Sequence, residues 1–268
     1  MTAARAASQS VQRVFERRAA RARELAATAG SAEEALRFAA GLNQAQGALA
    51  AAVEAAHARR PLDGRLRTDL PGLEASLADV LRFLAENGPA ALAHEAAAAG
   101  PSLVRDRLLS FWETGHSARQ DYLARALLRP YAEVLARFGV RPERPAAPGT
   151  CAFCAGMPGI AARRPVPESD GAERVLACAL CGGDWPLARI SCPACGEQDP
   201  ARLPSFSSAV YAGARIEACE SCRRYVKSID LTDDARRIPE VDDLASLGLD
   251  LWAAEQGFER VEPGLAGL

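Results

Sequence analysis

Lysine is almost absent from this sequence of 268 residues, since Lys227 is the single lysine among 32 basic residues. The 34 acidic residues balance the arginines and leave a formal net charge of −2. Binding to a polyanion requires a basic surface, so this charge makes no case for such a partner. The many arginines and alanines indicate compositional bias. In such a chain the single lysine is either a chance survivor or a residue kept for its geometry or reactivity, because lysine and arginine are not interchangeable.

Long apolar runs are also missing. No uncharged apolar stretch reaches the roughly 18 residues that a membrane-spanning helix requires. Arg17 and Arg18 form an arginine pair near the N-terminus, but the segment that follows, AARARELAATAG, carries charges that the apolar part of an export signal would not have. We therefore expect a cytoplasmic protein without a membrane span, with the arginine pair on a solvated face of the first helix.

Cysteine, by contrast, is plentiful. The eight cysteines form four Cys-x-x-Cys pairs, which are Cys151/Cys154, Cys178/Cys181, Cys192/Cys195 and Cys219/Cys222. In a reducing cytoplasm such cysteines are more typical of metal ligands than of disulfides. All eight follow the segment RPERPAAPG at 141–149, whose prolines predict a linker or a tight connection.

Strong helix formers dominate the first 140 residues. The expected helices cover about 31–58, a segment from Pro71 to Gly88, 102–113, and 117–138. Ser31 and Glu34 have the spacing of a capping box, and Pro130 should kink or split the last helix. Repeated apolar faces predict a helical bundle. The three histidines lack partners at metal-ligand spacing and are interpreted as surface or packing residues; they are His57, His94 and His116.

Beyond the linker the pattern changes to short strands, expected at 173–178, 186–191, 206–211, 214–219 and 224–231. A last helix is expected over 242–257. Asp242 would cap its start, Leu251 and Trp252 would lie on its apolar side, and Gly257 would end it.

The cysteine pairs repeat with a constant offset. Cys192 follows Cys151 by 41 residues, and Cys219 follows Cys178 by the same number. Flanking segments share the offset, because ERVLACALC and ARIEACESC occupy equivalent places. This pattern indicates a tandem duplication of a unit with the form C-x2-C-x23-C-x2-C.

One metal per unit is the simplest consequence. The first set would be Cys151, Cys154, Cys178 and Cys181, and the second Cys192, Cys195, Cys219 and Cys222. A crossed arrangement, first pair with third and second with fourth, is the main rival. Thioredoxin-type motifs, ferredoxin-type clusters and disulfides are weaker alternatives. A unit of about 40 residues buries too little apolar surface to fold alone, so a metal would supply stability.

Four thiolates suit zinc and iron alike, and the spacing does not separate them. Because the protein fills all four positions, no position is left for water or substrate, and we expect no metal catalysis and no enzyme. The elements predict an α+β protein in four parts. These are a helical domain at 1–145, two β modules of zinc-ribbon type at 146–188 and 189–235, and a C-terminal helix and tail at 236–268.

Acidic residues gather after the second module, at Asp230, Asp233, Asp234, Glu240, Asp242 and Asp243. They are interpreted as a solvated, capped helix start or, alternatively, as a dock for a basic peptide. The module region itself is close to neutral, and two four-thiolate sites with divalent ions would make it negative. Nucleic-acid binding is therefore disfavoured, although Arg163-Arg164 and Arg223-Arg224 are local basic pairs.

The segments CAFCAGMPG, LACALCGGDWPLARISCPAC, EACESCRRYVKSIDLTDD and VDDLASLGLDLWAAEQGFER resemble the formate dehydrogenase accessory protein family FdhE. The resemblance implies a helical N-terminal part, two rubredoxin-like modules, iron rather than zinc, and all eight cysteines as metal ligands. Further recurrent positions it implies are Trp185, Arg189, Tyr225, Lys227, Asp242 and Asp243. Ala155 and Arg223 depart from the pattern, because glycine is expected after the second cysteine of a pair.

By the same resemblance, the expected function is that of a cytoplasmic, chaperone-like maturation factor. It would bind the catalytic subunit of a respiratory formate dehydrogenase before export. A rubredoxin-like electron carrier and a zinc-ribbon nucleic-acid-binding protein are the alternatives. The sequence leaves the oligomeric state open.

Overall fold

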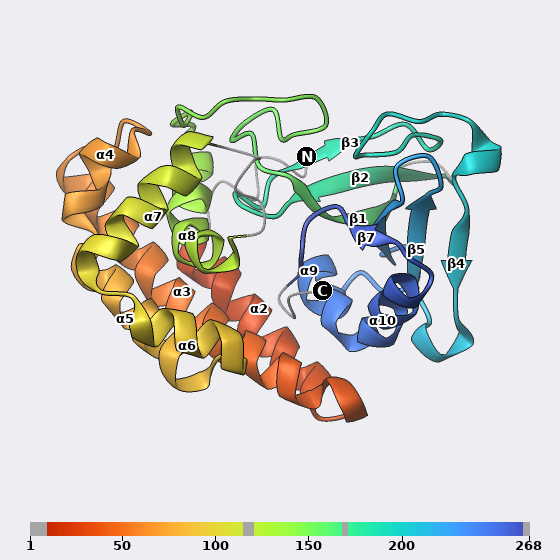
Figure 1. Ribbon diagram of the computed structural model, residues 1–268, viewed down its shortest axis with the longest axis horizontal. Helices are drawn as coiled ribbons and strands as arrows, with labels where there is room; N and C mark the ends of the chain where they lie inside the picture. The colour runs from red at the N-terminus through yellow and green to blue at the C-terminus, as the bar shows by residue number, and fades with distance from the viewer. Residues whose placement is uncertain (1–9, 115–120, 168–170, 265–268) are drawn as a thin grey trace.

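Helices fill the first half of the chain, and strands with two short C-terminal helices fill the second (Figure 1). The computed structural model describes residues 10–114, 121–167 and 171–264. The expected α+β architecture is confirmed: a helical region precedes a sheet region with two four-cysteine groups, and a helix closes the chain. None of the helices in these ranges is long and apolar enough to cross a membrane.

The helical region contains α2 (Val11–Ala26), α3 (Glu33–Arg59), α4 (Leu66–Asp69), α5 (Glu74–Asn87), α6 (Ala90–Ala98), α7 (Pro101–Thr114) and α8 (Tyr122–Phe138). Their apolar faces meet in one core, in which Phe15, Trp112 and Tyr131 are fully buried. The bundle predicted from the repeated apolar faces is therefore present.

Local details of the helices differ from expectation. A 3₁₀ turn at Gly30–Ala32 precedes α3, and no side chain caps that helix, so the expected capping box does not form. Pro130 lies inside α8 without dividing it. His57 is a packing residue as expected, because its ring stacks on Phe138 with centroids 4.2 Å apart. His116 lies outside the described residues, as does the start of the helix expected at 117–138.

The second half is built on one sheet of seven strands. They are β1 (Pro158–Pro165), β2 (Ala172–Cys178), β3 (Asp184–Pro186), β4 (Ser205–Ser207), β5 (Ala214–Cys219), β6 (Arg224–Asp230) and β7 (Glu259–Arg260). The order is β3-β2-β1-β6-β5-β4, and β7 pairs with β6. Neighbours are antiparallel except that β6 is parallel to both β1 and β7.

The two copies of the repeat join head to tail in this sheet. The 41-residue offset carries β2 onto β5 and β3 onto β6, so both copies run across the sheet in the same order. The junction is the parallel pair of β1 and β6, in which Ala161 lies opposite Ser228. The expected boundary between 188 and 189 thus separates two sequence units that share a sheet, and it stays a prediction, as do the other boundaries.

Strands at 173–178, 214–219 and 224–231 are confirmed to within one residue. The strands expected at 186–191 and 206–211 are wrong over most of their length, because β3 ends at Pro186 and a 3₁₀ turn occupies Ala209–Tyr211. β1 and β7 were not predicted. β1 contains prolines and an arginine pair, and its pairing with β2 and β6 stabilises it rather than any intrinsic preference.

The C-terminal helix is divided into α9 (Pro239–Asp242), a 3₁₀ turn (Asp243–Ser246) and α10 (Leu247–Glu255). Asp242 therefore ends α9 and does not cap a long helix. Leu251 is exposed and not on the apolar side, whereas Trp252 packs on Phe206. Gly257 follows α10 with φ +76°, as expected for the residue after a helix.

Candidate metal centres

The structure brings the cysteines together in two groups of four. One group is Cys151, Cys154, Cys178 and Cys181, and the other is Cys192, Cys195, Cys219 and Cys222. Within each group the four sulfur atoms lie within 4.8 Å of one another. Each copy of the repeat thus gathers its own four cysteines, and the described residues hold no group of the crossed kind. Within the described ranges all eight cysteines are free of disulfides.

The sulfur separations fit a tetrahedral metal. In the first group Cys151 Sγ lies 3.7 Å from Cys181 Sγ, and Cys154 Sγ lies 3.4 Å from Cys178 Sγ. In the second group both corresponding separations are 3.7 Å. A metal with bonds of about 2.3 Å to four sulfurs at tetrahedral angles requires sulfurs roughly 3.8 Å apart. The donor set and its spacing therefore fit one zinc or iron ion in each group.

Each Cys-x-x-Cys pair is followed by a residue in the left-handed region. These residues are Ala155, Gly182, Gly196 and Arg223, with φ of 56°, 67°, 78° and 57°. In three pairs the N–H of this residue donates to the carbonyl oxygen of the first cysteine, at 2.8 to 3.2 Å. The departures at Ala155 and Arg223 therefore keep the turn, although left-handed backbone is costly for residues with a Cβ atom. They are the only residues other than glycine with positive φ in the described chain.

The backbone passes close to the cysteine sulfurs in both groups, and near the first group this requires a glycine. A Cβ atom on Gly156 would lie 2.7 Å from Cys178 Sγ, so only glycine fits there. The N–H groups of Leu180 and Ala194 donate to Cys178 Sγ and Cys192 Sγ, each at 3.4 Å. Such donors favour the thiolate form that a metal requires.

Burial acts in the opposite direction on these thiols. Removal from water raises the pKa of Cys178 and the pKa of Cys192, because desolvation disfavours the charged thiolate. Four thiolates close together repel one another as well. A bound cation offsets both effects, which is a further reason to interpret these groups as metal centres.

The two groups differ in their surroundings. All four cysteines of the first group are at most 5% exposed and belong to the same core as the helices. In the second group Cys195 is exposed and Cys222 is half-buried. The first group is thus part of the junction between helices and sheet, whereas the second lies at the surface.

An ionic cluster ties the helices to the first group. Arg18 is buried and donates to Glu133 of α8 at 2.8 Å and to Glu240 of α9 at 2.6 Å. Arg129 joins the same two carboxylates. The expectation that both members of the arginine pair face solvent is therefore wrong for Arg18 and holds for Arg17. No local pattern indicates a partner for Arg18, because Glu133 and Glu240 are 115 and 222 residues away in the chain.

The acidic residues near the C-terminus pair within the chain. Asp242 accepts from Arg21 Nε at 3.0 Å, and Asp230 accepts from Arg163 at 2.9 Å. Glu240 binds Arg18, so Glu240 and Asp242 both pair with arginines of the same helix, α2. The expectation of a solvated helix start is thus wrong for these acids. The basic segment that occupies the expected dock is α2 itself.

Lys227 lies at the centre of a second buried cluster. Its Nζ donates to the carbonyl oxygen of Asp243 at 2.9 Å and to the carboxylate of Asp250, and its side chain is fully buried. Asp250 also accepts from Tyr225 Oη at 2.8 Å. Arg260 donates to both aspartates. The cluster holds β6 against the C-terminal helices and supports the interpretation that this lysine is kept for its geometry.

Trp185 and Arg189 lie apart from this cluster. Trp185 is partly buried on β3 and packs against Leu176 and Val226, whereas Arg189 is exposed. Neither belongs to a four-cysteine group. Their roles stay predictions.

Both a family model and a solved structure match this chain. The model of the FdhE C-terminal domain matches residues 190–266. The crystal structure of the FdhE protein from Pseudomonas aeruginosa matches 96% of this chain and 96% of that chain, with a TM-score of 0.67 and 26% identity. The resemblance to the FdhE family is confirmed.

Curated FdhE homologs agree over a shorter range. The homolog of Aquifex aeolicus is 37% identical over 117 residues, which are 44% of this chain and 41% of the homolog. The homolog of Pseudomonas putida is 38% identical over 96 residues, which are 34% of this chain and 30% of the homolog. These alignments thus span less than half of the curated FdhE homologs.

Proposed function

We propose that this chain is an FdhE-type accessory protein that acts as a cytoplasmic, chaperone-like maturation factor. It would bind the catalytic subunit of a respiratory formate dehydrogenase before export. The observation that carries the proposal is the likeness to an FdhE structure over nearly the whole of both chains, helices included. The two four-cysteine groups support it further.

The eight cysteines would hold two metal ions, one in each group. Iron is favoured by the family resemblance, and zinc suits the same four thiolates. A metal bound by four cysteines has no open position, so we propose a structural role and no catalysis. The four parts, at 1–145, 146–188, 189–235 and 236–268, would be the helical domain, the two rubredoxin-like modules, and the C-terminal helix and tail.

Anaerobic co-purification tests the client. The tagged chain is expressed with the catalytic subunit of a formate dehydrogenase, and in parallel with an unrelated exported oxidoreductase subunit as the control. We expect a complex with the first and none with the second. No association with the formate dehydrogenase subunit, or equal association with both, would contradict the proposal.

The exposed second group favours one other candidate, an electron carrier, because electrons reach a metal more readily near the surface. Iron-loaded protein that changes colour reversibly on reduction and passes electrons to an acceptor protein would support that function. A colourless zinc protein would remove it. Nucleic-acid binding has no such support, because the basic pair Arg163-Arg164 is engaged by Asp230 and Asp184.

A further inference from the structure

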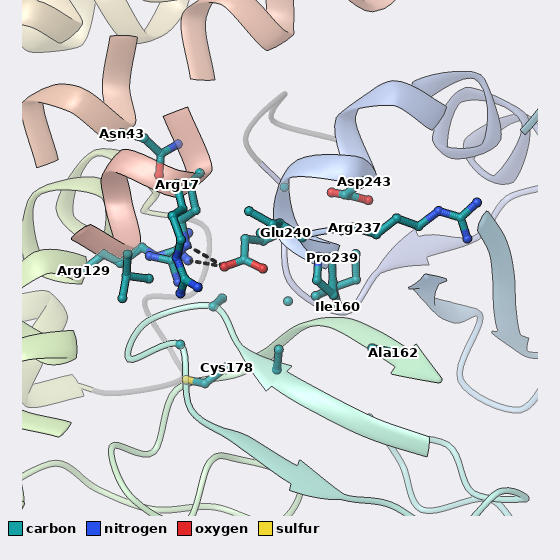
Figure 2. Close-up of a pocket in the computed structure, with 18 of the residues that line it drawn as sticks. Arg17, Asn43, Arg129, Ile160, Ala162, Cys178, Arg237, Pro239, Glu240 and Asp243 are labelled. Atoms are coloured by element: carbon teal, nitrogen blue, oxygen red, sulfur yellow. Dashed lines mark hydrogen bonds and ion pairs between the residues drawn. The ribbon is translucent and has the colours of Figure 1, made fainter. Parts of the chain in front are cut away.

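A cavity of about 550 Å³ lies where the helices meet the sheet. Residues of α2, α3 and α8 form one wall, β1 and β2 form another, and the segment 235–240 closes a third (Figure 2). Its volume is in the range of ligand sites in proteins. It borders the first metal centre, because Cys178 and Gly182 line it, but it contains none of the other cysteines.

Arginine dominates the charged part of the wall, with eight arginines against two acidic residues. Most of these arginines are engaged by carboxylates; Arg18 and Arg129, for example, share Glu133 and Glu240. Arg17 is different. It is exposed, lines the cavity as Arg129 does, and has no ion pair within the described residues (Figure 2). Arg237 also lacks a carboxylate partner, but it donates to the carbonyl oxygens of Asp230 and Ala212. Within the described residues the cavity thus offers one cation, Arg17, that needs a partner.

Asn43 provides an independent sign of a ligand. Its side chain is only 3% exposed and lines the cavity. Its Nδ2 donates to the carbonyl oxygen of Ala39 at 2.8 Å, whereas its Oδ1 has no hydrogen-bond partner among the described residues. A buried acceptor without a donor is destabilising, so a ligand that brings an N–H group would satisfy it.

The opposite wall is apolar. Ile160, Ala162 and Val175 of the sheet line it together with Leu231 and Pro239. The cavity therefore offers three kinds of contact: a cation, an acceptor of hydrogen bonds, and an apolar surface. An extended peptide with an acidic side chain supplies all three complements, namely a carboxylate, backbone N–H groups and aliphatic carbons.

We propose that this cavity binds an acidic peptide segment, with its carboxylate on Arg17 and a backbone N–H on Asn43 Oδ1. Inorganic phosphate fits less well, because it offers no aliphatic carbon to the apolar wall and carries about two charges beside the carboxylate of Glu240. The inference rests on the proposed function, in that the client subunit would supply the segment. Three acids of the expected dock for a basic segment are already paired inside this chain, namely Asp230, Glu240 and Asp242.

The test uses the full chain with its metals, purified anaerobically, and a fluorescent blocked peptide of about six residues with two glutamates. The same peptide with glutamines is the control ligand. We expect the acidic peptide to bind at least tenfold more tightly, and Arg17→Ala to weaken it about tenfold. Arg23→Ala removes an exposed arginine from the same helix outside the cavity and should leave the affinity unchanged.

Asn43→Leu is a second variant that keeps all charges, and it should weaken the acidic peptide severalfold. Equal affinity for both peptides overturns the inference, and so does an equal effect of Arg17→Ala and Arg23→Ala. Inorganic phosphate that binds while the peptide does not would also overturn it, by assigning the cavity to a small oxyanion.

The two proposals fail separately. A chain that associates with the catalytic subunit but binds no acidic peptide loses the inference and keeps the proposed function. A chain that binds the peptide but not the subunit keeps the inference about the cavity and loses the proposed function. Where the peptide binds, Arg17→Glu should abolish its binding, and Arg23→Glu, as the control, should not.

Discussion

Arg18 of α2 and Glu133 of α8 form an ion pair 2.8 Å long in which both side chains are only 6% exposed. The pair lies directly on a turn of the first four-cysteine group, because a Cβ atom on Gly182, next to Cys181, would meet both side chains at 3.3 Å. Glu240 binds the same guanidinium from α9. One arginine thus links the helical bundle, the first four-cysteine group and the C-terminal segment.

Removing the charge of Glu133 should destabilise the chain. Glu133→Gln leaves Arg18 and Arg129 with Glu240 as their shared carboxylate, and an undercompensated buried charge costs about 3 kcal/mol of the free energy of unfolding. Anaerobic urea denaturation measures the change. Asp79→Asn, which breaks an exposed pair with Arg82, is the control and should change the value by less than about 0.5 kcal/mol. Equal effects of the two variants would contradict the coupling.

The pairing of Glu240 predicts a pH dependence. Burial opposes its ionisation, but Arg18 and Arg129 outweigh burial and lower its pKa to about 2, from an ordinary 4.5. Because the folded pKa is the lower one, the stabilisation is complete above pH 4.5 and is lost as the pH falls towards 2.

Glu240→Gln should therefore unfold more easily than the wild type at pH 7, by up to about 3 kcal/mol, and the difference should shrink towards pH 2. Denaturation curves of both proteins at several pH values give this difference, and acid release of metal affects both alike. Glu16→Gln, at an exposed position of α2, is the control. A constant difference across the pH range would disprove the pairing.

Serine substitutions should separate the two metal centres. Cys192→Ser should lower the metal content from two ions to one, with a smaller loss of stability than Cys151→Ser causes, because the second group lies at the surface. Cys151→Ser should also leave one ion, but with a larger drop in melting temperature, since Cys151 belongs to the helical core. Metal analysis and thermal unfolding check both. Loss of both metals in Cys192→Ser would indicate shared ligands.

The left-handed turns predict opposite effects for two small substitutions. Ala155→Gly removes a cost of about 1–2 kcal/mol for a Cβ atom at φ 56° and adds about 0.5–1 kcal/mol of backbone entropy, so stability should rise by roughly 0.5 kcal/mol. Gly182→Ala should lower it by more than about 1 kcal/mol, because the new Cβ atom also crowds Arg18 and Glu133. Matched urea curves decide, and a change of the same sign in both would refute the argument.

The sequence predicts the cysteine groups well because their information is local and repeated. The offset between Cys151 and Cys192 identifies the copies, and the short spacing within each pair brings two sulfurs to one turn. The departures at Ala155 and Arg223 were visible too. Their consequence, a strained turn kept without glycine, needed the backbone angles.

Features that depend on distant partners were not predictable in this way. Arg18 was expected in solvent because a charge on a helix is usually exposed, and nothing near it indicates Glu133 or Glu240. β1 was missed for the same reason, since its pairing with β2 and β6 outweighs its prolines. Lys227 lies between these cases, because its rarity is a property of the sequence, whereas its aspartate partners depend on the fold.

The head-to-tail joining of the two copies has a consequence for self-association. Two copies related by a twofold axis would form a closed pair, whereas a head-to-tail arrangement leaves two different ends. Here β4 lies at one edge of the sheet and β3 at the other, so further molecules added edge to edge would extend the sheet into a fibre. Each of these rim strands is only three residues long. Such short edge strands offer few backbone hydrogen bonds to another chain, and this protects the protein against edge-to-edge polymerisation.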